Sequence, residues 1–352
     1  MSNKKKIGLV GYLGYSVKNP IIGGQMSKTR GIYQELRRKY GDKDLIVIDT
    51  SNWKNEKLSL IFGMAKMGLK CDPIIIMPNK NGIKIILPFF SVLKKVFNYS
   101  LAYPIVGGWL TNLLELHKYL IKAIKNVDYI LPETKQLRNE LSAYFEIKMD
   151  VMSIFSTRKP VSENQVKTEW YGIKTFCTFS RVTPEKGIDE AIEAINVINR
   201  DGKICHLDIW GPIDPDYKEH YEKLFREQKD QITYKGILSE DKGLEVFSDY
   251  YMMLFPTYYP GEGFPTSICE SFMAGLPVIA SDWRFNKELV IDGKTGFLFP
   301  VHDINKLSKK ILECINNTEV VNRMKYEALN YSKKFKPDVV TADLFNWIDS
   351  VR

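Results

Sequence analysis

Residues 259–282 read Tyr-Pro-Gly-Glu-Gly-Phe-Pro-Thr-Ser-Ile-Cys-Glu-Ser-Phe-Met-Ala-Gly-Leu-Pro-Val-Ile-Ala-Ser-Asp. The glycines and prolines of the first half predict a turn-rich loop, and Pro265, which has no N–H, suits the first helical position. The pattern then predicts a short helix over 266–274, which Gly275 ends. A buried strand over 276–280 follows, because this run is apolar and short. A strand of this kind after a helix is typical of an α/β protein with parallel sheets.

Two glutamates eight positions apart carry the chemistry of this stretch. Glu262 lies in the loop that faces the start of the helix, and Glu270 lies within the helix. The N–H groups at a helix N-terminus attract an anion, and a carboxylate one turn further in accepts hydrogen bonds from sugar hydroxyls. The pattern therefore predicts a site for a phosphorylated sugar. The alternative is a helix with two solvated acids.

The spacing Glu-x7-Glu, followed by Met-Ala-Gly-Leu-Pro-Val-Ile-Ala, resembles the donor-site signature of the retaining family 4 (group 1) glycosyltransferases. The resemblance is dense from about residue 174 to 300 and thin before that. It implies the GT-B fold, which has two Rossmann-like domains with parallel sheets facing a central cleft. It also implies that the C-terminal helix crosses back to the first domain.

The length of 352 residues suits two domains rather than one core. We expect an acceptor domain over 1–160, a donor domain over 168–335 and a returning helix over 336–352, with the polar stretch 158–167 as a hinge. Apolar runs alternate with amphipathic stretches, as in βαβ units. The predicted strands are 6–10, 45–49, 73–77, 101–106, 129–131, 149–154, 174–180, 204–210, 232–234, 252–255 and 278–280.

Two cations follow the predicted strand 174–180, at the end where parallel sheets bind ligands. Arg181 offers a fork for phosphate oxygens and Lys186 a point charge, and both match the family's diphosphate-binding pair. The alternative for Lys186 is an ion pair with Glu190, one helical turn on. The resemblance makes Glu262, Arg181 and Lys186 the candidate catalytic residues. The candidate donor-binding residues are Gly24, Gly211, Gly236, Ile237, Gly263, Phe264, Thr266, Ser267 and Glu270.

The chain departs from the family at a first-domain histidine near the transferred sugar. His117 is expected in the middle of a helix, and the glycine pair Gly107–Gly108 stands at the family's position instead. This pair resembles a subgroup of bacterial surface-polysaccharide transferases, and its N–H groups are expected to replace the histidine near donor or acceptor. Asp214 and Asp216 spell D-x-D away from the expected phosphates, so they are interpreted as a turn and helix cap. No metal or other cofactor is expected.

Residues 1–160 contain 26 Lys and Arg against 12 Asp and Glu, a net charge of +14, whereas residues 161–352 have a net charge of −6. This asymmetry favours an anionic partner for the first half, here a lipid-linked acceptor at the inner face of the plasma membrane. The alternatives are a solvated lysine surface or nucleic acid, for which no motif is present. The candidate membrane contacts are Lys28, Arg30, Arg37, Arg38, Lys39 and the stretch 89–97.

The remaining features are those of a soluble cytoplasmic protein. Five scattered cysteines, with no C-x-x-C pair, are expected to be reduced core residues. The N-terminal residues lack the apolar run of a signal peptide. The uncharged stretch 96–114 is long enough for a membrane span, but its glycines, asparagines and Pro104 favour a strand, a turn and a helix.

We therefore expect an enzyme that moves a sugar from a nucleoside-diphosphate sugar, such as a UDP-sugar, to a hydroxyl of a glycan or lipid-linked acceptor, with retention. Bacterial capsule or other surface-polysaccharide synthesis is the expected setting. Two alternatives share the fold, a non-hydrolysing sugar-nucleotide epimerase and a non-catalytic nucleotide-sugar-binding protein. A third alternative, an NAD-dependent oxidoreductase, would use Asp49 for the ribose but lacks the glycine fingerprint.

Overall fold

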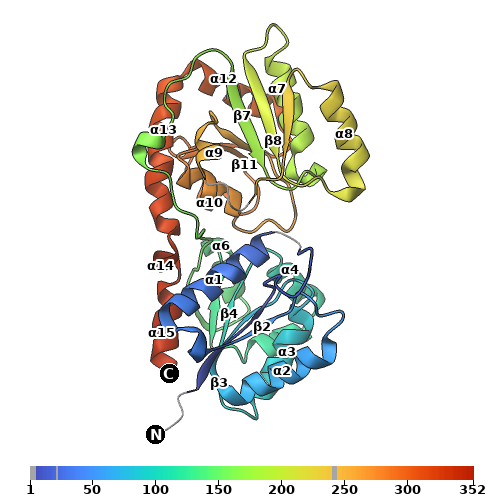
Figure 1. Cartoon of the computed structure of the whole chain (residues 1–352), viewed down its shortest axis with the longest axis vertical. Helices are drawn as coiled ribbons and strands as arrows, with labels where there is room; N and C mark the ends of the chain where they lie inside the picture. The colour runs from blue at the N-terminus through green and yellow to red at the C-terminus, as the bar shows by residue number, and fades with distance from the viewer. Residues whose placement is uncertain (1–4, 21–22, 240–243) are drawn as a thin grey trace. The chain divides into compact units, whose positions relative to one another are not determined.

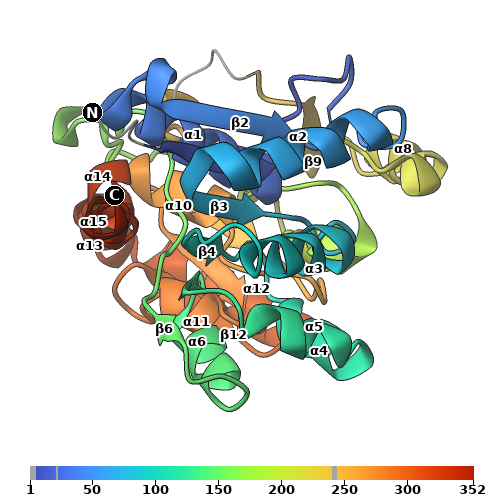
Figure 2. The same cartoon turned by 90° about the horizontal axis from the view of Figure 1, so that it is seen from below.

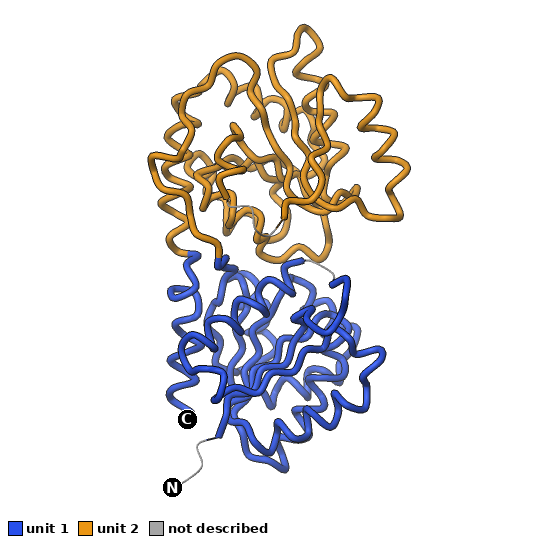
Figure 3. The backbone as a smooth tube through the Cα atoms, in the orientation of Figure 1, with its two compact units in different colours: residues 1–157, 335–352 blue, residues 158–334 orange. Residues whose placement is uncertain are grey.

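The computed structural model describes residues 5–20, 23–239 and 244–352 (Figure 1). The chain divides into two compact units, one formed by residues 1–157 with 335–352 and the other by residues 158–334 (Figure 3). Each unit contains a six-stranded sheet whose neighbouring strands all pair in parallel. The predicted α/β class, with one parallel sheet in each half, is confirmed.

The sheet of the first unit has the strand order β2-β1-β3-β4-β5-β6. Its strands are β1 (Lys6–Gly11), β2 (Leu45–Asp49), β3 (Cys71–Met77), β4 (Leu101–Pro104), β5 (Tyr129–Leu131) and β6 (Lys148–Met149). Its helices are α1 (Gly24–Tyr40), α2 (Lys57–Lys70), α3 (Ile83–Lys94), α4 (Leu110–Leu116), α5 (Tyr119–Ile124), α6 (Lys135–Ser142), α14 (Pro337–Val340) and α15 (Ala342–Val351). The central strands are continuous apolar runs because helices cover both faces of the sheet.

Side chains of β1 alternate between these two faces. Ile7 and Leu9 belong to a core that also contains residues of α1 and α15. Gly8, between them, faces α2, where a Cβ atom would lie 2.7 Å from Sδ of Met67. The absence of a side chain at this position therefore lets α2 approach the sheet.

The second unit has the strand order β12-β11-β10-β7-β8-β9. Its strands are β7 (Lys174–Phe179), β8 (Cys205–Trp210), β9 (Ile232–Gly236), β10 (Met253–Phe255), β11 (Val278–Ser281) and β12 (Gly296–Phe299). Its helices are α7 (Ile188–Ile198), α8 (Lys218–Glu227), α9 (Glu245–Ser248), α10 (Thr266–Met273), α11 (Asn286–Leu289), α12 (Ile304–Asn316) and α13 (Thr318–Ser332). Since all six strands run the same way, their carboxyl ends meet at one edge, where ligands bind in such sheets.

The C-terminal residues return to the first unit, as expected. The ring of Trp347 in α15 lies 5.5 Å from the ring of Tyr129 in β5. Lys39 of α1 donates to Asp349 over 2.6 Å. These contacts make α15 part of the core of the first unit.

One strand prediction was wrong, and one strand was missed. The predicted strand 149–154 is reduced to β6, because its partner β5 is followed by Pro132, which has no N–H for the ladder. Met152 donates to the Pro132 carbonyl, and the apolar residues after it are buried without strand pairing. The edge strand β12 was not predicted, because it is short and lies next to a glycine-rich turn.

The stretch 158–167, the predicted hinge, packs on the second unit. The Val161 N–H donates to the carbonyl of Met273, and Val161 and Val166 are buried. A 3-10 turn, Glu163–Gln165, closes with a capping box from Ser162.

All five cysteines are free and buried, as predicted. The uncharged stretch 96–114 forms β4, a turn in which Gly107 has φ 86°, and α4. Within the described part of the chain, no helix is both long and apolar enough to cross a membrane.

Candidate functional site

A buried ion pair lies at the carboxyl edge of the second unit's sheet. Nζ of Lys186 donates to Oε2 of Glu262 over 2.6 Å, and the two side chains are 10% and 9% exposed. The hydroxyl of Thr257 donates to the same oxygen over 2.8 Å. The sequence reasoning found both charges but did not predict that they pair with each other. Thr257 was missed, although it directly follows β10 and Pro256.

The alternative pairing of Lys186 with Glu190 is wrong. Glu190 instead contacts Nδ1 of His302 over 2.6 Å. Burial raises the pKa of Glu190, and the hydrogen bond from His302 opposes this shift.

The backbone at Gly187 directs Lys186 toward the pair. Lys186 ends a 3-10 turn, Pro184–Lys186, and Gly187 follows with φ 70°, a left-handed conformation that favours glycine. A Cβ atom here would lie 2.2 Å from the carbonyl oxygen of Pro256. The loops after β7 and β10 can therefore approach closely only because residue 187 has no side chain.

Arg181 shares an aromatic neighbour with Lys186. The guanidinium of Arg181 lies 5.6 Å from the ring centre of Tyr259, and Nζ of Lys186 lies 4.9 Å from it. The Tyr259 carbonyl accepts the indole N–H of Trp283 over 2.8 Å, which holds this loop. Tyr259 was missed as a site residue, although it opens the stretch that carries the family signature.

Asp214 is the N-cap of a 3-10 turn, Pro215–Tyr217, and its side chain accepts the N–H of Asp216, as predicted. The expectation that Asp214 lies away from the phosphate-binding residues is wrong. Its Oδ2 lies 4.0 Å from Nη1 of Arg181. The loop after β8 bends back toward the end of β7, a proximity that sequence distance hides.

Helix α10 begins beside this cluster. It starts at Thr266, and Pro265 is its N-cap rather than its first helical residue, with ψ 122°. Pro265 supplies no side-chain cap to the first-turn N–H groups. Ser267 lies in this first turn, and the buried hydroxyl of Thr266 has no hydrogen-bond partner within the described residues. The arrangement suits an anion at the helix N-terminus.

Glu270 lies in the second turn of α10, partly buried. Its Oε1 lies 3.6 Å from Nε of Arg158. The sequence reasoning assigned Arg158 to the hinge and so missed this contact. The acid and its cationic neighbour lie within the same unit as Lys186 and Glu262.

Gly211 and Gly236, two of the candidate donor-binding residues, also lie at the carboxyl edge. Gly211 follows β8 with φ 129°, and a Cβ atom there would lie 1.8 Å from the Ser180 carbonyl oxygen. Its N–H donates to the carbonyl of Gly236, at the end of β9. Ile237, the next residue, is exposed. These backbone contacts bring the ends of β7, β8 and β9 together.

In the first unit, Gly24 is the first residue of α1 and Gly23 is its N-cap. The prediction for Gly107 fails, because its N–H donates to Oε2 of Glu133 over 3.0 Å and is not available to a ligand. Gly108, the other member of the pair, also has an interaction of its own. His117 ends α4 as its C-cap and does not lie in the middle of a helix.

Glu133 is itself held by a buried lysine. Nζ of Lys28 donates to Oε1 of Glu133 and to the carbonyls of Ile105 and Met152, over 3.0 to 3.1 Å. Burial lowers the pKa of Lys28, and Glu133 opposes this shift. Lys28 is fully buried, so its expected role as a membrane contact is wrong. Sequence reasoning counted it as a surface charge.

Asp49 does not present the free carboxylate that a dinucleotide ribose requires. Its two oxygens accept the N–H groups of residues 13–16 over 2.7 to 3.3 Å and also bind Ser51. Burial opposes ionisation, but these donors hold the pKa of Asp49 below its usual value. The residue organises the loop after β1, which removes the main argument for an NAD-dependent oxidoreductase.

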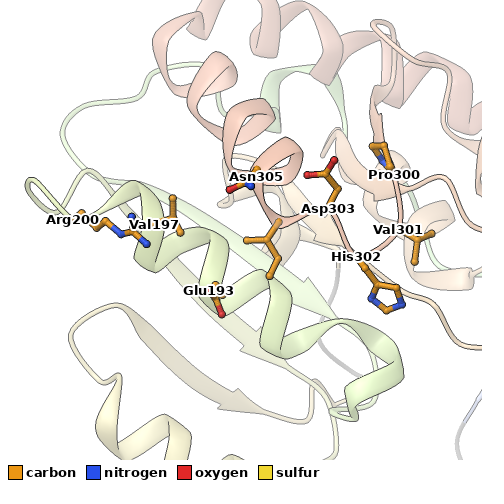
Figure 4. Close-up of a pocket in the computed structure, with 9 residues that line it drawn as sticks. Glu193, Val197, Arg200, Pro300, Val301, His302, Asp303 and Asn305 are labelled. Carbon is orange, nitrogen blue, oxygen red and sulfur yellow. The ribbon is translucent and has the colours of Figure 1, made fainter.

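A hollow of about 530 Å³ lies elsewhere in the second unit, between α7 and the start of α12 (Figure 4). It is lined by Glu193, Val197, Arg200, Pro300, Val301, His302, Asp303, Ile304 and Asn305. None of the sequence-predicted site residues lines it. Across residues 5–20, 23–239 and 244–352, no three His, Cys, Asp or Glu side chains gather as a metal site requires.

Two units, each built on a parallel six-stranded sheet, are the architecture of the GT-B fold. Residues 162–331, in the second unit, match the family model described as glycosyl transferases group 1. The second unit is therefore similar to the group 1 glycosyl transferases.

Curated relatives match over part of their length. The poly(ribitol-phosphate) alpha-N-acetylglucosaminyltransferase of Staphylococcus aureus (strain COL) is 24% identical over 203 residues, 57% of this chain and 39% of the relative. The poly(glycerol-phosphate) alpha-glucosyltransferase of Bacillus subtilis (strain 168) is 22% identical over 48% of this chain and 24% of the relative. The chain thus spans well under two thirds of these relatives.

Solved structures share the fold over nearly the whole chain. The Anabaena protein HepE in complex with UDP has a TM-score of 0.74 at 13% identity and covers 98% of this chain and 100% of its own. The sucrose-phosphate synthase of Thermosynechococcus elongatus has a TM-score of 0.76 at 15% identity and covers 99% of both chains. At these identities the likeness concerns the fold.

Proposed function

We propose that this protein is a retaining, metal-independent glycosyltransferase of family 4. It transfers a sugar from a UDP-sugar to a hydroxyl of a lipid-linked glycan, in the synthesis of a bacterial surface polysaccharide such as a capsule. The observation that carries the proposal is the cluster of Lys186, Glu262 and Arg181 beside the N-terminus of α10. The family match supports the reaction class.

The cluster provides what departure of a nucleoside diphosphate requires. Negative charge grows on the diphosphate as the bond to the sugar breaks, and fixed positive groups lower the energy of that state. Arg181 is 45% exposed and can present its fork to phosphate oxygens. Lys186 is held in place by Glu262, so little reorganisation is needed when the donor binds.

Glu262 then has two roles in the proposal. Its contacts with Lys186 and Thr257 both use Oε2, and we assign Oε1 to hydroxyls of the transferred sugar. Glu270, beside Arg158, is assigned to the donor ribose. Gly236 and Ile237 are assigned to the base.

The proposed chemistry takes place on one face of the sugar. The acceptor oxygen forms a bond to the anomeric carbon as the bond from that carbon to the phosphate oxygen breaks. The acceptor's proton passes to the leaving phosphate oxygen, so no protein carboxylate needs to form a covalent intermediate. The product keeps the anomeric configuration of the donor.

The names of the relatives support the proposed setting. Two relatives are named as transferases that act on poly(ribitol-phosphate) and poly(glycerol-phosphate), and another is named for capsular polysaccharide biosynthesis. The solved structure of HepE is described as a complex with UDP, which makes UDP-sugars the first donors to test.

The test is a panel of UDP-, GDP- and ADP-sugars read by nucleoside-diphosphate release and by NMR of the sugar. We expect slow hydrolysis of one donor, lost in Glu262→Ala and reduced in Glu270→Ala. Glu222→Ala, at an exposed ion pair of α8, is the matched control and keeps the activity. Interconversion of sugars would instead indicate an epimerase, and binding without product a nucleotide-sugar sensor. Either result would overturn the proposal.

A further inference from the structure

The outer face of α2 is apolar. Leu58, Ile61, Phe62 and Leu69 are exposed, and Leu58 and Phe62 are each 73% exposed. Their spacing of three, one and seven residues places all four within an arc of about 100° around the helix axis, on one side of the helix. The opposite side, with Met64 and Met67, packs on the sheet. An amphipathic helix normally has one apolar side, which packs on the core. Helix α2 has a second apolar side, which is exposed.

The neighbouring helix α3 continues this surface. Ile85 and Val92 are exposed and Phe89 is partly exposed, at spacings of four and three residues that place them on one side of α3. Val96, in the turn that follows α3, is also exposed. Helices α2 and α3 contact each other, and Figure 2 shows them side by side in one layer. We call the outward residues of the two helices the α2–α3 face.

Lysines surround the α2–α3 face. Residues 53–128 contain eleven lysines and no arginine, against four acids, which gives a net charge of +7. Lys57 and Lys66 border the apolar stripe of α2 on opposite sides, and Lys84 and Lys95 border that of α3. Of the acids, Asp128 is engaged by Lys94.

The basic residues of α1, in contrast, are engaged within the first unit. Arg37 pairs with Asp42, Arg38 with Glu35 and Lys39 with Asp349. Their charges are therefore balanced locally. Residues 53–128, which contain α2 and α3, hold +7 of the net charge of +14 in residues 1–160.

We propose that the α2–α3 face docks this protein on an anionic lipid bilayer, with Leu58, Phe62 and Val92 entering the acyl boundary. A helix with an apolar stripe bordered by lysines lies in the plane of the bilayer interface, where the lysine charges meet lipid phosphates. Two copies of this face would bring the bordering lysines of one copy against those of the other, so charge opposes self-association. The role of this docking rests on the proposed function, because an enzyme with a lipid-linked acceptor must reach that acceptor at the membrane. The docking itself does not depend on that function.

The experiment is sedimentation of the full chain with vesicles of phosphatidylcholine alone or mixed with phosphatidylglycerol. We expect binding to the mixed vesicles that falls as salt rises. Phe62→Ser is expected to weaken binding about tenfold, because a largely exposed ring no longer enters the bilayer. Lys57→Gln is expected to weaken it about fivefold at low salt. Tyr171→Ser, at a highly exposed ring of the second unit, is the matched control and binds like the parent.

Donor hydrolysis without vesicles separates this proposal from the proposed function. Phe62→Ser should keep the hydrolysis rate of the parent, because the residue lies in the other unit from Lys186 and Glu262. Vesicle binding that Phe62→Ser and Val92→Ser leave unchanged would overturn the docking surface, whatever the hydrolysis result. A parent chain that self-associates through Phe62 and ignores both kinds of vesicle would also overturn it.

Discussion

Breaking the Lys186–Glu262 pair in a double-mutant cycle tests the contact on which the site depends. The two side chains are nearly buried and their charged atoms are 2.6 Å apart. Removing one partner leaves an uncompensated buried charge, which costs about 3 kcal/mol. Removing both leaves no stranded charge, so Lys186→Met with Glu262→Gln should cost no more than either single variant, at most about 3 kcal/mol. The coupling energy is then at least about 3 kcal/mol.

Urea denaturation followed by tryptophan fluorescence, with unchanged m-values, measures these differences. The control cycle uses Lys218→Met and Glu222→Gln, an exposed pair at 3.7 Å in the same unit, whose coupling should stay below about 0.5 kcal/mol. Donor turnover should fall about 100-fold in each single variant at the central pair and should not recover in the double variant. Additive destabilisation at Lys186 and Glu262, within about 0.5 kcal/mol, would refute the ion pair.

Three further predictions follow from local geometry. Gly187→Ala should lower the free energy of unfolding by about 3 kcal/mol, because φ is 70° and the Pro256 oxygen would lie 2.2 Å from the new Cβ. The control Gly293→Ala, at φ 72° with no atom near the new Cβ, should cost about 1 kcal/mol in the same urea assay. Burial lowers the pKa of Lys325 from 10.5 to about 7, so the unfolded chain binds more protons between these values. The stability of the parent relative to Lys325→Met should therefore rise with pH across that window, and a flat difference would contradict this. Donor hydrolysis should survive EDTA, and activity restored only by added Mg²⁺ or Mn²⁺ would exclude the metal-independent mechanism.

The fold was largely predictable because its signals are local. The run 129–131 coincides with β5, since a buried parallel strand needs a short continuous apolar segment. The run 45–49 coincides with the edge strand β2. The prediction failed where pairing depended on a distant partner. The predicted strand 149–154 ends early because Pro132, which follows its partner strand, has no N–H to donate. Nothing in the sequence of residues 149–154 indicates that this donor is missing.

The residues of the candidate site could be named from the sequence, but their arrangement could not. Glu262 and Lys186 were identified from motifs 76 positions apart, yet their direct bond was not foreseen. Lys28 looks like any surface lysine in the sequence and is fully buried against Glu133. Partner choice among charged side chains depends on distances that sequence periodicity does not contain.

The sequence alone determined the class of fold, the family signature in 259–282 and the excess of positive charge in the first half. These properties depend on residue type and short-range spacing. Only the tertiary structure decided that Lys186 pairs with Glu262, that the Gly107 N–H is occupied by Glu133 and that α2 carries an exposed apolar stripe. The first two are contacts between segments far apart in the chain. The third is an apolar surface that no other described segment buries. A local pattern shows that a residue is charged or apolar, and the fold decides what it meets.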